Sequence, residues 1–184
     1  MAELLKNPQI LEKAQEELAD LIGKGKLVEE ADVAKLLYLQ CIVKETLRIH
    51  IPVPFLIPRK VEEDVEICGY IVPKNSQVLV NAWAIGCDSN IWDDPLVFKP
   101  ERFLESEVDF RGQDFELIPF GAGRRICPAL PLAERMILVV LGSLINKFNW
   151  KLDGGIDPKD LNMDEKFGLT SLKAQPLRAI PIPL

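Results

Sequence analysis

The sequence has no apolar segment long enough to cross a membrane. Its longest apolar run extends from Met136 to Ile145 and is interrupted by Gly142 and Ser143. A membrane-spanning helix needs about 20 apolar residues, and no signal peptide opens the chain. We therefore expect none of these residues to span a bilayer.

The sequence also lacks an excess of basic residues. It contains 22 lysines and arginines against 28 aspartates and glutamates, which gives a net charge of −6. This balance disfavours nucleic acid as the main partner. The length of 184 residues, with 48% hydrophobic and 27% charged residues, is typical of one globular domain with a sizeable core.

The common zinc and disulfide patterns are missing as well. The four cysteines, Cys41, Cys68, Cys87 and Cys127, include no C-x-x-C pair, so a zinc site is not expected. The chain is neither small nor rich in cysteine, which favours reduced thiols. We expect Cys41, Cys68 and Cys87 to be structural thiols.

The periodicity of apolar residues predicts three helices. Asn7-Pro8 supplies a cap and a first-turn proline, which indicates a helix over about residues 7–23. Further apolar repeats predict helices over about 31–49 and 131–148. The last of these is apolar on most faces, so we expect it to be deeply buried.

Extended structure is predicted between the second and third helices. Prolines at 52, 54 and 58 disfavour helix. Alternating Val and Ile residues, separated by turn signals at Cys68-Gly69 and 73–76, predict β-structure over about 64–85. Residues 86–119 are expected to be irregular and 176–184 extended. The fold class is therefore mainly α with small β-sheets, that is, α+β.

The segment F-G-A-G-R-R-I-C, residues 120–127, carries the strongest chemical signal. Gly121 and Gly123 permit φ > 0 and a close approach of the backbone to a flat group. Cys127 precedes a helix N-terminus, which carries partial positive charge, and the two adjacent arginines add full charges. These effects favour the thiolate over the thiol, which suits metal ligation or nucleophilic chemistry.

Other functions of this loop are less well supported. A cysteine nucleophile needs a basic histidine, and the single histidine, His50, follows a different helix. A dinucleotide-binding G-x-G-x-x-G motif would need a glycine where Ile126 stands, within a strand–turn–helix unit. A hydrolase site is therefore disfavoured and a dinucleotide site is excluded, whereas a purely structural loop stays open.

The pattern Phe120-x-x-Gly123-x-Arg125-x-Cys127 resembles the haem-binding signature of the cytochrome P-450 superfamily, the haem-thiolate monooxygenases. The resemblance implies haem b as cofactor, Cys127 as the proximal iron ligand and Gly123 as part of the cofactor-binding loop. Thiolate ligation favours O–O cleavage. It further implies that Arg125 and Arg59 pair with the haem propionates and that Phe120 shields the ligand.

The sequence departs from the family pattern directly after the cysteine. The family usually has glycine where Ala129 stands, and a methyl group there would crowd the haem face or the next helix. Pro128 lacks an N–H, which removes one donor to the sulfur. Fewer donors leave a more electron-rich thiolate and are expected to lower the redox potential.

Two further motifs match the family in the same order along the chain. Glu45 and Arg48 form an E-x-x-R pair on one helix face, and Arg102 lies in a later P-E-R-F segment. Alone, the Glu45–Arg48 pair is typical of a solvated surface salt bridge, and the P-E-R-F segment is a weak signal. By resemblance, the three side chains form a buried triad that braces the core behind the haem.

Two apolar segments resemble substrate-contacting segments of the family, although plain apolar packing is the alternative. Their candidate residues are Val53, Pro54, Phe55, Leu56, Phe167 and Leu169. The spacing from Met163 to Pro176 resembles plant terpenoid hydroxylases such as geraniol hydroxylases.

The resemblance covers essentially the whole chain but only the C-terminal part of the family fold. Residues 1–184 are therefore expected to be a single partial haem-binding domain, truncated on its N-terminal side. Residues 1–5 resemble the end of the family's long central helix, so the proton-delivery residues and the membrane anchor would lie upstream. We expect no catalytic residue within the chain, and membrane association only through that missing anchor. The full-length parent is expected on the cytosolic face of the endoplasmic reticulum membrane.

The implied function is monooxygenation of a small lipophilic, terpenoid-like substrate. Electrons would come from NADPH through a flavoprotein reductase. Arg124 and Lys44 are expected to face that partner, and a merely solvated role for both is the alternative. One alternative stays open: a catalytically incompetent fragment that at most binds haem or acts through protein contacts.

Overall fold

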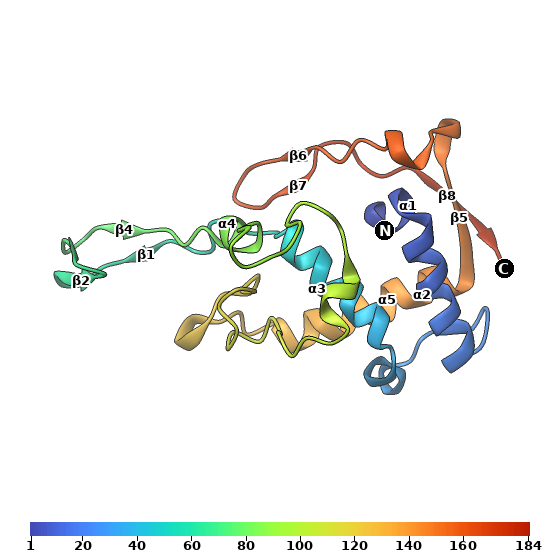
Figure 1. The fold of residues 1–184 in the computed structure, drawn as a ribbon, viewed down its shortest axis with the longest axis horizontal. Helices are drawn as coiled ribbons and strands as arrows, with labels where there is room; N and C mark the ends of the chain where they lie inside the picture. The colour runs from blue at the N-terminus through green and yellow to red at the C-terminus, as the bar shows by residue number, and fades with distance from the viewer.

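Three long helices form the centre of the molecule in the computed structural model, which describes residues 1–184 (Figure 1). They are α2 (Pro8–Leu21), α3 (Leu37–Ile49) and α5 (Leu130–Lys147). Two shorter α-helices are α1 (Ala2–Lys6) and α4 (Ala82–Gly86). The remaining helical turns are 3₁₀ segments: Glu30–Lys35, Pro100–Phe103, Gly123–Arg125, Asp153–Gly155 and Pro158–Asp160.

The helix α2 is amphipathic and covers one side of the core. Pro8 lies in its first turn, where no backbone N–H is needed. Ile10, Ala14 and Leu18 recur every four residues and are buried, so they form one face toward α3 and α5. They belong to a single cluster of 20 buried residues that also includes Leu39, Ile42, Leu138 and Ile145. Full burial of one such aliphatic side chain stabilises the fold by about 1.5–3 kcal/mol.

The helix expected over residues 31–49 is divided in the structure. Residues Glu30–Lys35 form a 3₁₀ helix, Leu36 has a non-helical backbone conformation, and α3 begins at Leu37. The cause is a side chain from α2: the carboxylate of Glu17 accepts hydrogen bonds from the backbone N–H of Tyr38 (2.7 Å) and of Leu39 (3.0 Å). This acceptor satisfies amides that lack a partner at a helix start, so a tertiary contact fixes where α3 begins.

The strands form four separate two-stranded antiparallel sheets. The pairs are β1 (Arg59–Lys60) with β4 (Gln77–Val78), β2 (Val65–Ile67) with β3 (Tyr70–Val72), β5 (Phe148–Leu152) with β8 (Ala179–Pro183), and β6 (Glu165–Lys166) with β7 (Leu172–Lys173). The first two sheets form an arm that projects away from the helices, whereas β5 and β8 lie at the opposite end of the molecule (Figure 1). The observed structure is thus mainly helical with small sheets, which confirms the α+β class.

The β-region expected over 64–85 has different limits. Strand pairing begins at Arg59 and ends at Val78. Beyond it, the side chain of Asn81 accepts a hydrogen bond from the Ala84 N–H (3.0 Å) and starts α4, because Asn is a favourable N-cap. The turn between β2 and β3 lies at Cys68-Gly69 as predicted, and both residues have positive φ.

The helix α5 is not deeply buried on all sides, contrary to the expectation. Leu138 and Ile145 are buried against α2 and α3. Leu132, Met136 and Val140, which follow one another at four-residue intervals, are 64%, 54% and 48% exposed. Apolar composition alone could not distinguish these faces, because the chain supplies a packing partner to only one of them.

None of the helices combines the length and the apolar character that crossing a bilayer requires.

Candidate functional site

The loop that carries Cys127 is shaped by its own backbone hydrogen bonds. The N–H of Cys127 donates to the carbonyl of Phe120 (2.9 Å), and the N–H of Ile126 donates to the carbonyl of Gly123 (3.1 Å). Gly121 and Gly123 have φ values of 75° and 65°, a region that side chains rarely adopt. The two glycines therefore permit the reversal that brings Cys127 back beside Phe120.

The thiol of Cys127 lies at the end of this loop, immediately before α5. It is free and half-buried. The carbonyl of Cys127 accepts a hydrogen bond from the Leu130 N–H (3.2 Å), which joins the loop to the first residue of α5. A cysteine in this setting is both anchored and accessible, as a ligand requires.

Phe120 supports the loop from the core side. Its ring lies 5.7 Å from the ring of Phe110, with the planes tilted by 54°, which is a favourable aromatic geometry. Gly112 closes the same side: a Cβ built on it would lie 2.8 Å from Cδ1 of Ile126, and its φ is 80°. The sequence patterns missed Gly112, because only its distance to the loop in space gives it this role.

The arginines predicted to hold propionates are free of carboxylates. Arg125 follows the glycine turn, Arg59 lies in β1, and both are exposed. The ion pairs of arginines near the loop instead involve Arg111 with Glu134 (3.0 Å) and Arg135 with Glu30 (2.9 Å). Arg125 and Arg59 thus present unneutralised guanidinium groups.

A cavity of about 780 Å³ adjoins Cys127 on the side of α5 and the 30–35 helix. The two arginine–glutamate pairs just described line it, together with Ile126, Pro128 and Leu130. Phe120, Gly123 and Arg125 do not line it, so this cavity is not the predicted cofactor face. Gly123 has open space where a Cβ would lie, which leaves its side of the loop available to a flat group.

The structure brings Glu45, Arg48 and Arg102 into direct contact. Arg48 donates to both oxygens of Glu45, from Nε to Oε2 and from Nη2 to Oε1, each at 2.8 Å. Arg102 Nε reaches Oε1 at 3.1 Å. The side chains of Glu45 and Arg48 are fully buried and that of Arg102 is 9% exposed.

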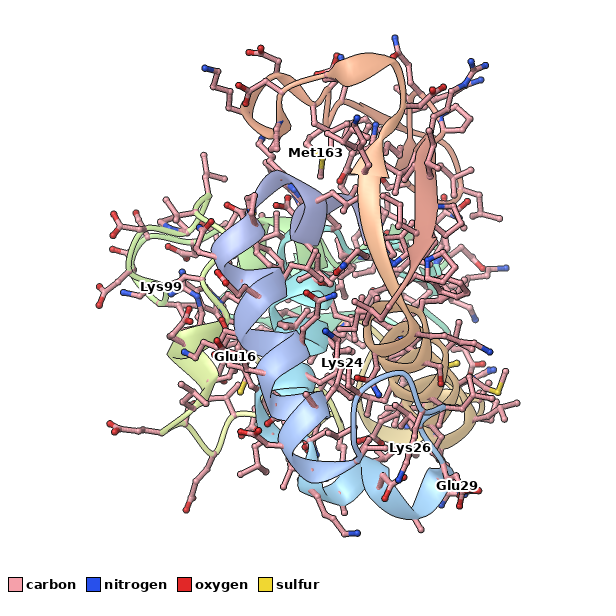
Figure 2. All side chains as sticks on the ribbon, turned by 90° about the vertical axis from the view of Figure 1, so that its right-hand side faces the viewer. Glu16, Lys24, Lys26, Glu29, Lys99 and Met163 are labelled. Atoms are coloured by element: carbon pink, nitrogen blue, oxygen red, sulfur yellow. The ribbon has the colours of Figure 1, made fainter.

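The remaining hydrogen-bonding capacity of this cluster goes to the backbone. Arg48 Nη1 donates to the carbonyls of Gly86 and Pro95, and Glu45 also accepts from the N–H of Lys99 (2.8 Å). Figure 2 shows Lys99 on the loop that flanks α2. The charges are therefore paired and hydrogen-bonded, as burial requires, and they fasten α3 to the irregular segment after α4.

Two residues of the cluster were not predicted. Gly86 faces the carbonyl of Arg48 so closely that a Cβ would lie 2.6 Å from that oxygen. The indole of Trp92 lies 5.2 Å from Arg48 Cζ and 5.9 Å from Arg102 Cζ, a cation–π arrangement. Its buried Nε1 has no hydrogen-bond partner. Neither residue belongs to a recognisable motif, since their roles arise from contacts across the chain.

The two predicted substrate-contacting segments lie against each other. The Ser171 N–H, just after the 167–170 turn, donates to the carbonyl of Pro52 (2.7 Å), and the Trp83 N–H donates to the carbonyl of Pro54 (3.2 Å). Phe55, Phe167 and Leu169 are 50%, 64% and 77% exposed. Val53 and Leu56 are half-buried and Pro54 is buried. One backbone hydrogen bond, from Ser171 to Pro52, therefore joins the ends of the two segments, and Leu56 packs against Ile51, Ala82 and Ile118.

Lys44 makes contacts within the chain, whereas Arg124 and Ala129 are exposed. Lys44 is not a free surface cation: its Nζ donates to the carbonyl of Val108 (2.8 Å) and lies 5.8 Å from the Phe103 ring. Arg124 is exposed. Ala129 has a φ of −86° and is exposed, so the backbone at this position does not require glycine. The roles of the remaining site residues toward haem stay predictions.

The chain is similar to known proteins over nearly its whole length. The sequence model of the family described as Cytochrome P-450 matches residues 1–178. Geraniol 8-hydroxylase of Catharanthus roseus is 69% identical over 181 residues, which cover 98% of this chain and 37% of the relative. Geraniol 8-hydroxylase of Swertia mussotii is 70% identical over 184 residues, which are 100% of this chain and 37% of that relative.

The fold has a counterpart among solved structures. A structure of a zebrafish cytochrome P-450 with progesterone matches with a TM-score of 0.86 at 32% identity, covering 100% of this chain and 40% of that one. The chain thus spans 37% of the length of the two hydroxylases it matches.

Proposed function

The chain belongs to the cytochrome P-450 family, and on that premise we propose that it is the haem-binding part of a monooxygenase that hydroxylates small lipophilic, terpenoid substrates. The observation that carries the proposal is the Cys127 loop: an accessible thiol fixed beside Phe120 at the start of α5. The relatives named geraniol 8-hydroxylase support the terpenoid class.

The residues of the loop fit haem. A single soft thiolate is the donor that the family uses for iron, and Cys127 is free and half-exposed. Gly123 leaves the backbone open to a flat group, and the unpaired guanidinium groups of Arg125 and Arg59 suit two propionates. Thiolate-bound haem supplies the oxygen-activating chemistry of the family.

The chain's own contribution to function is support and orientation. Residues 1–184 would act as one partial haem-binding domain in which Glu45, Arg48 and Arg102 hold α3 against the segment that precedes the loop. Val53, Pro54, Phe55, Leu56, Phe167 and Leu169 would supply an apolar surface for the substrate. An apolar wall excludes water and orients a lipophilic substrate.

Electrons would arrive from NADPH through a flavoprotein reductase. Arg124 is exposed beside Arg125 in the loop, and its positive charge would steer an acidic partner. The full-length parent would work at the cytosolic face of the endoplasmic reticulum membrane.

A second candidate function is that of a chain without catalysis of its own. The exposed apolar stripe of α5, formed by Leu132, Met136 and Val140, favours it, because a stripe of this kind is typical of a surface that another segment covers. Such a chain would bind haem at most, or act through protein contacts.

Haem spectroscopy separates the two candidates. The chain is loaded with haem, reduced and exposed to carbon monoxide, beside Cys127→Ser and a matched control, Cys68→Ser, which removes an exposed thiol outside the loop. We expect a thiolate-type band in the unmodified chain, called the parent from here on, and in the Cys68→Ser control, but not in Cys127→Ser. A histidine-type band, or no band in the parent, favours the second candidate. Turnover with a reductase then distinguishes haem binding from catalysis.

A further inference from the structure

His50 lies between two carboxylates at the C-terminal end of α3. Its Nδ1 is 2.6 Å from Oε1 of Glu165, and its Nε2 is 2.7 Å from Oε1 of Glu3. Ionised carboxylates only accept hydrogen bonds, so this geometry suits an imidazolium that donates from both ring nitrogens. The three side chains are 12–25% exposed, which leaves little solvent to screen their charges.

Glu165 connects His50 to the end of the 167–170 turn. Its second oxygen, Oε2, accepts a hydrogen bond from the Ser171 hydroxyl (2.6 Å). The backbone N–H of Ser171 donates to the carbonyl of Pro52 (2.7 Å), and Pro52 is two residues beyond His50. A closed ring of contacts therefore runs from His50 through Glu165 and Ser171 to Pro52 and back along the chain.

The hairpin that carries the turn has few other restraints. β6 and β7 share only two residue pairs, Glu165 with Lys173 and Lys166 with Leu172, and an isolated two-stranded hairpin is marginally stable at best. The apolar tip residues Phe167 and Leu169 are exposed, so their packing does not hold the turn. Figure 2 places Met163, which precedes β6, above the N-terminal helices, where it shares a cavity of about 180 Å³ with His50 and Glu3.

We propose that His50 is a positioning residue that, through Glu165 and Ser171, fixes the 167–170 turn against the 52–57 segment and so sets the shape of the apolar surface that meets the substrate. That this surface meets the substrate rests on the proposed function. The contacts that hold the turn do not depend on it. His50 does not touch the substrate; it acts on specificity through the turn.

The charged groups around His50 are consistent with a protonated ring. Glu3 faces it from α1 and Glu165 from β6. Met1 and Lys173 line the same cavity, but Lys173 Nζ donates to the carbonyls of Asn162 (2.6 Å) and Gln175 (3.0 Å). Burial lowers the pKa of His50, and the hydrogen bonds and charges of the two glutamates outweigh it, so the pKa is raised above 6.5. Deprotonation at higher pH is expected to release the turn.

Amide hydrogen exchange of the chain tests the proposal. We compare the parent with His50→Gln and Ser171→Ala, and follow residues 165–173 with the β5–β8 sheet as the internal reference. At pH 6, each substitution is expected to speed exchange of 165–173 by about tenfold relative to the reference, because a charge-assisted contact is lost. After correction for the intrinsic rate, protection in the parent should fall between pH 6 and pH 9, and that in His50→Gln should not.

The outcomes separate this proposal from the proposed function. Unchanged exchange in both variants, or protection of 165–173 that does not depend on pH in the parent, overturns the positioning role. The haem–carbon monoxide spectrum is recorded in parallel, and since His50 forms no hydrogen bond with the 120–129 loop, we expect His50→Gln to match the parent. A parent without a thiolate-type band but with the expected exchange pattern defeats the haem assignment and leaves the positioning role supported.

Discussion

Gly86 and Arg48 meet so closely that no side chain fits between them. A Cβ on Gly86 would lie 2.6 Å from the Arg48 carbonyl oxygen, while Arg48 Nη1 donates to the Gly86 carbonyl. The turn of α4 is thus fastened to the end of α3 at the point where the buried ion pair lies. The positions of Glu45 and Arg48 depend on this approach.

We expect Gly86→Ala to destabilise the chain by about 1–3 kcal/mol, because the neighbouring atom is backbone and cannot rotate away. Urea unfolding followed by circular dichroism measures the change. Gly168→Ala is the matched control, since its Cβ would make an ordinary contact of 3.5 Å with Thr170. Equal stability of Gly86→Ala and the parent would contradict the packing described.

Removal of Glu45 should have a larger effect. Glu45→Ala leaves two buried guanidinium groups without their carboxylate, and breaking one side of a buried pair costs about 3–5 kcal/mol. We also expect the variant to incorporate no haem. Arg135→Ala is the control: it removes an exposed pair of similar length, 2.9 Å, and such pairs contribute about 0–1 kcal/mol. A normal haem spectrum in Glu45→Ala would argue against the triad as a brace.

Stability should depend on pH through His50. The glutamates raise its pKa in the folded state above 6.5, so the folded chain binds the proton more tightly than the unfolded chain. The resulting stabilisation is fully present below pH 6.5 and is lost as the pH rises through the folded-state pKa. The difference in unfolding free energy between the parent and His50→Gln is therefore expected to shrink from pH 6 to pH 9. A constant or growing difference would show that the ring is neutral in the folded chain.

The four thiols should react at different rates. Cys68 is exposed, Cys127 and Cys87 are half-buried, and Cys41 is buried. Burial raises the pKa of Cys41 and of Cys87, which lowers the fraction of reactive thiolate. Iodoacetamide labelling with peptide mass spectrometry is expected to modify Cys68 first and Cys41 last. Bound haem should slow the labelling of Cys127 and leave Cys68 unaffected; equal protection of both would point to non-specific binding.

Local signals in the sequence predicted the elements that depend on local chemistry. Pro8 lies in the first turn of α2 as predicted, and Cys68-Gly69 supplies the positive φ values of the β2–β3 turn. The positive φ values of Gly121 and Gly123 in the Cys127 loop could likewise be predicted, because glycine adopts this conformation without steric cost. The predicted Asn7 cap is wrong: its side chain makes no capping hydrogen bond, because its amide donates to Glu3 instead.

Long-range contacts account for what the sequence did not reveal. The break before α3 is set by Glu17, 21 residues before Tyr38, and the partner of His50 on β6 is 115 residues away. Trp92 and Gly86 have no pattern that marks them as neighbours of Arg48. The exposed side of α5 was predicted wrongly because apolar residues show only that burial would be favourable. Whether another element packs on them depends on the three-dimensional arrangement.

The contact of Glu17 with the first amides of α3 has a consequence for how the chain folds. A helix that receives its cap from another helix gains that stabilisation of its first turn only when the two have docked. The segment bearing Glu45 and Arg48 is therefore expected to gain full helicity only in concert with α2, which makes 8–49 one cooperative unit. An isolated peptide of residues 37–49 should be frayed at its N-terminal end. Proteolytic cleavage between α2 and α3 should also weaken the contacts among Glu45, Arg48 and Arg102.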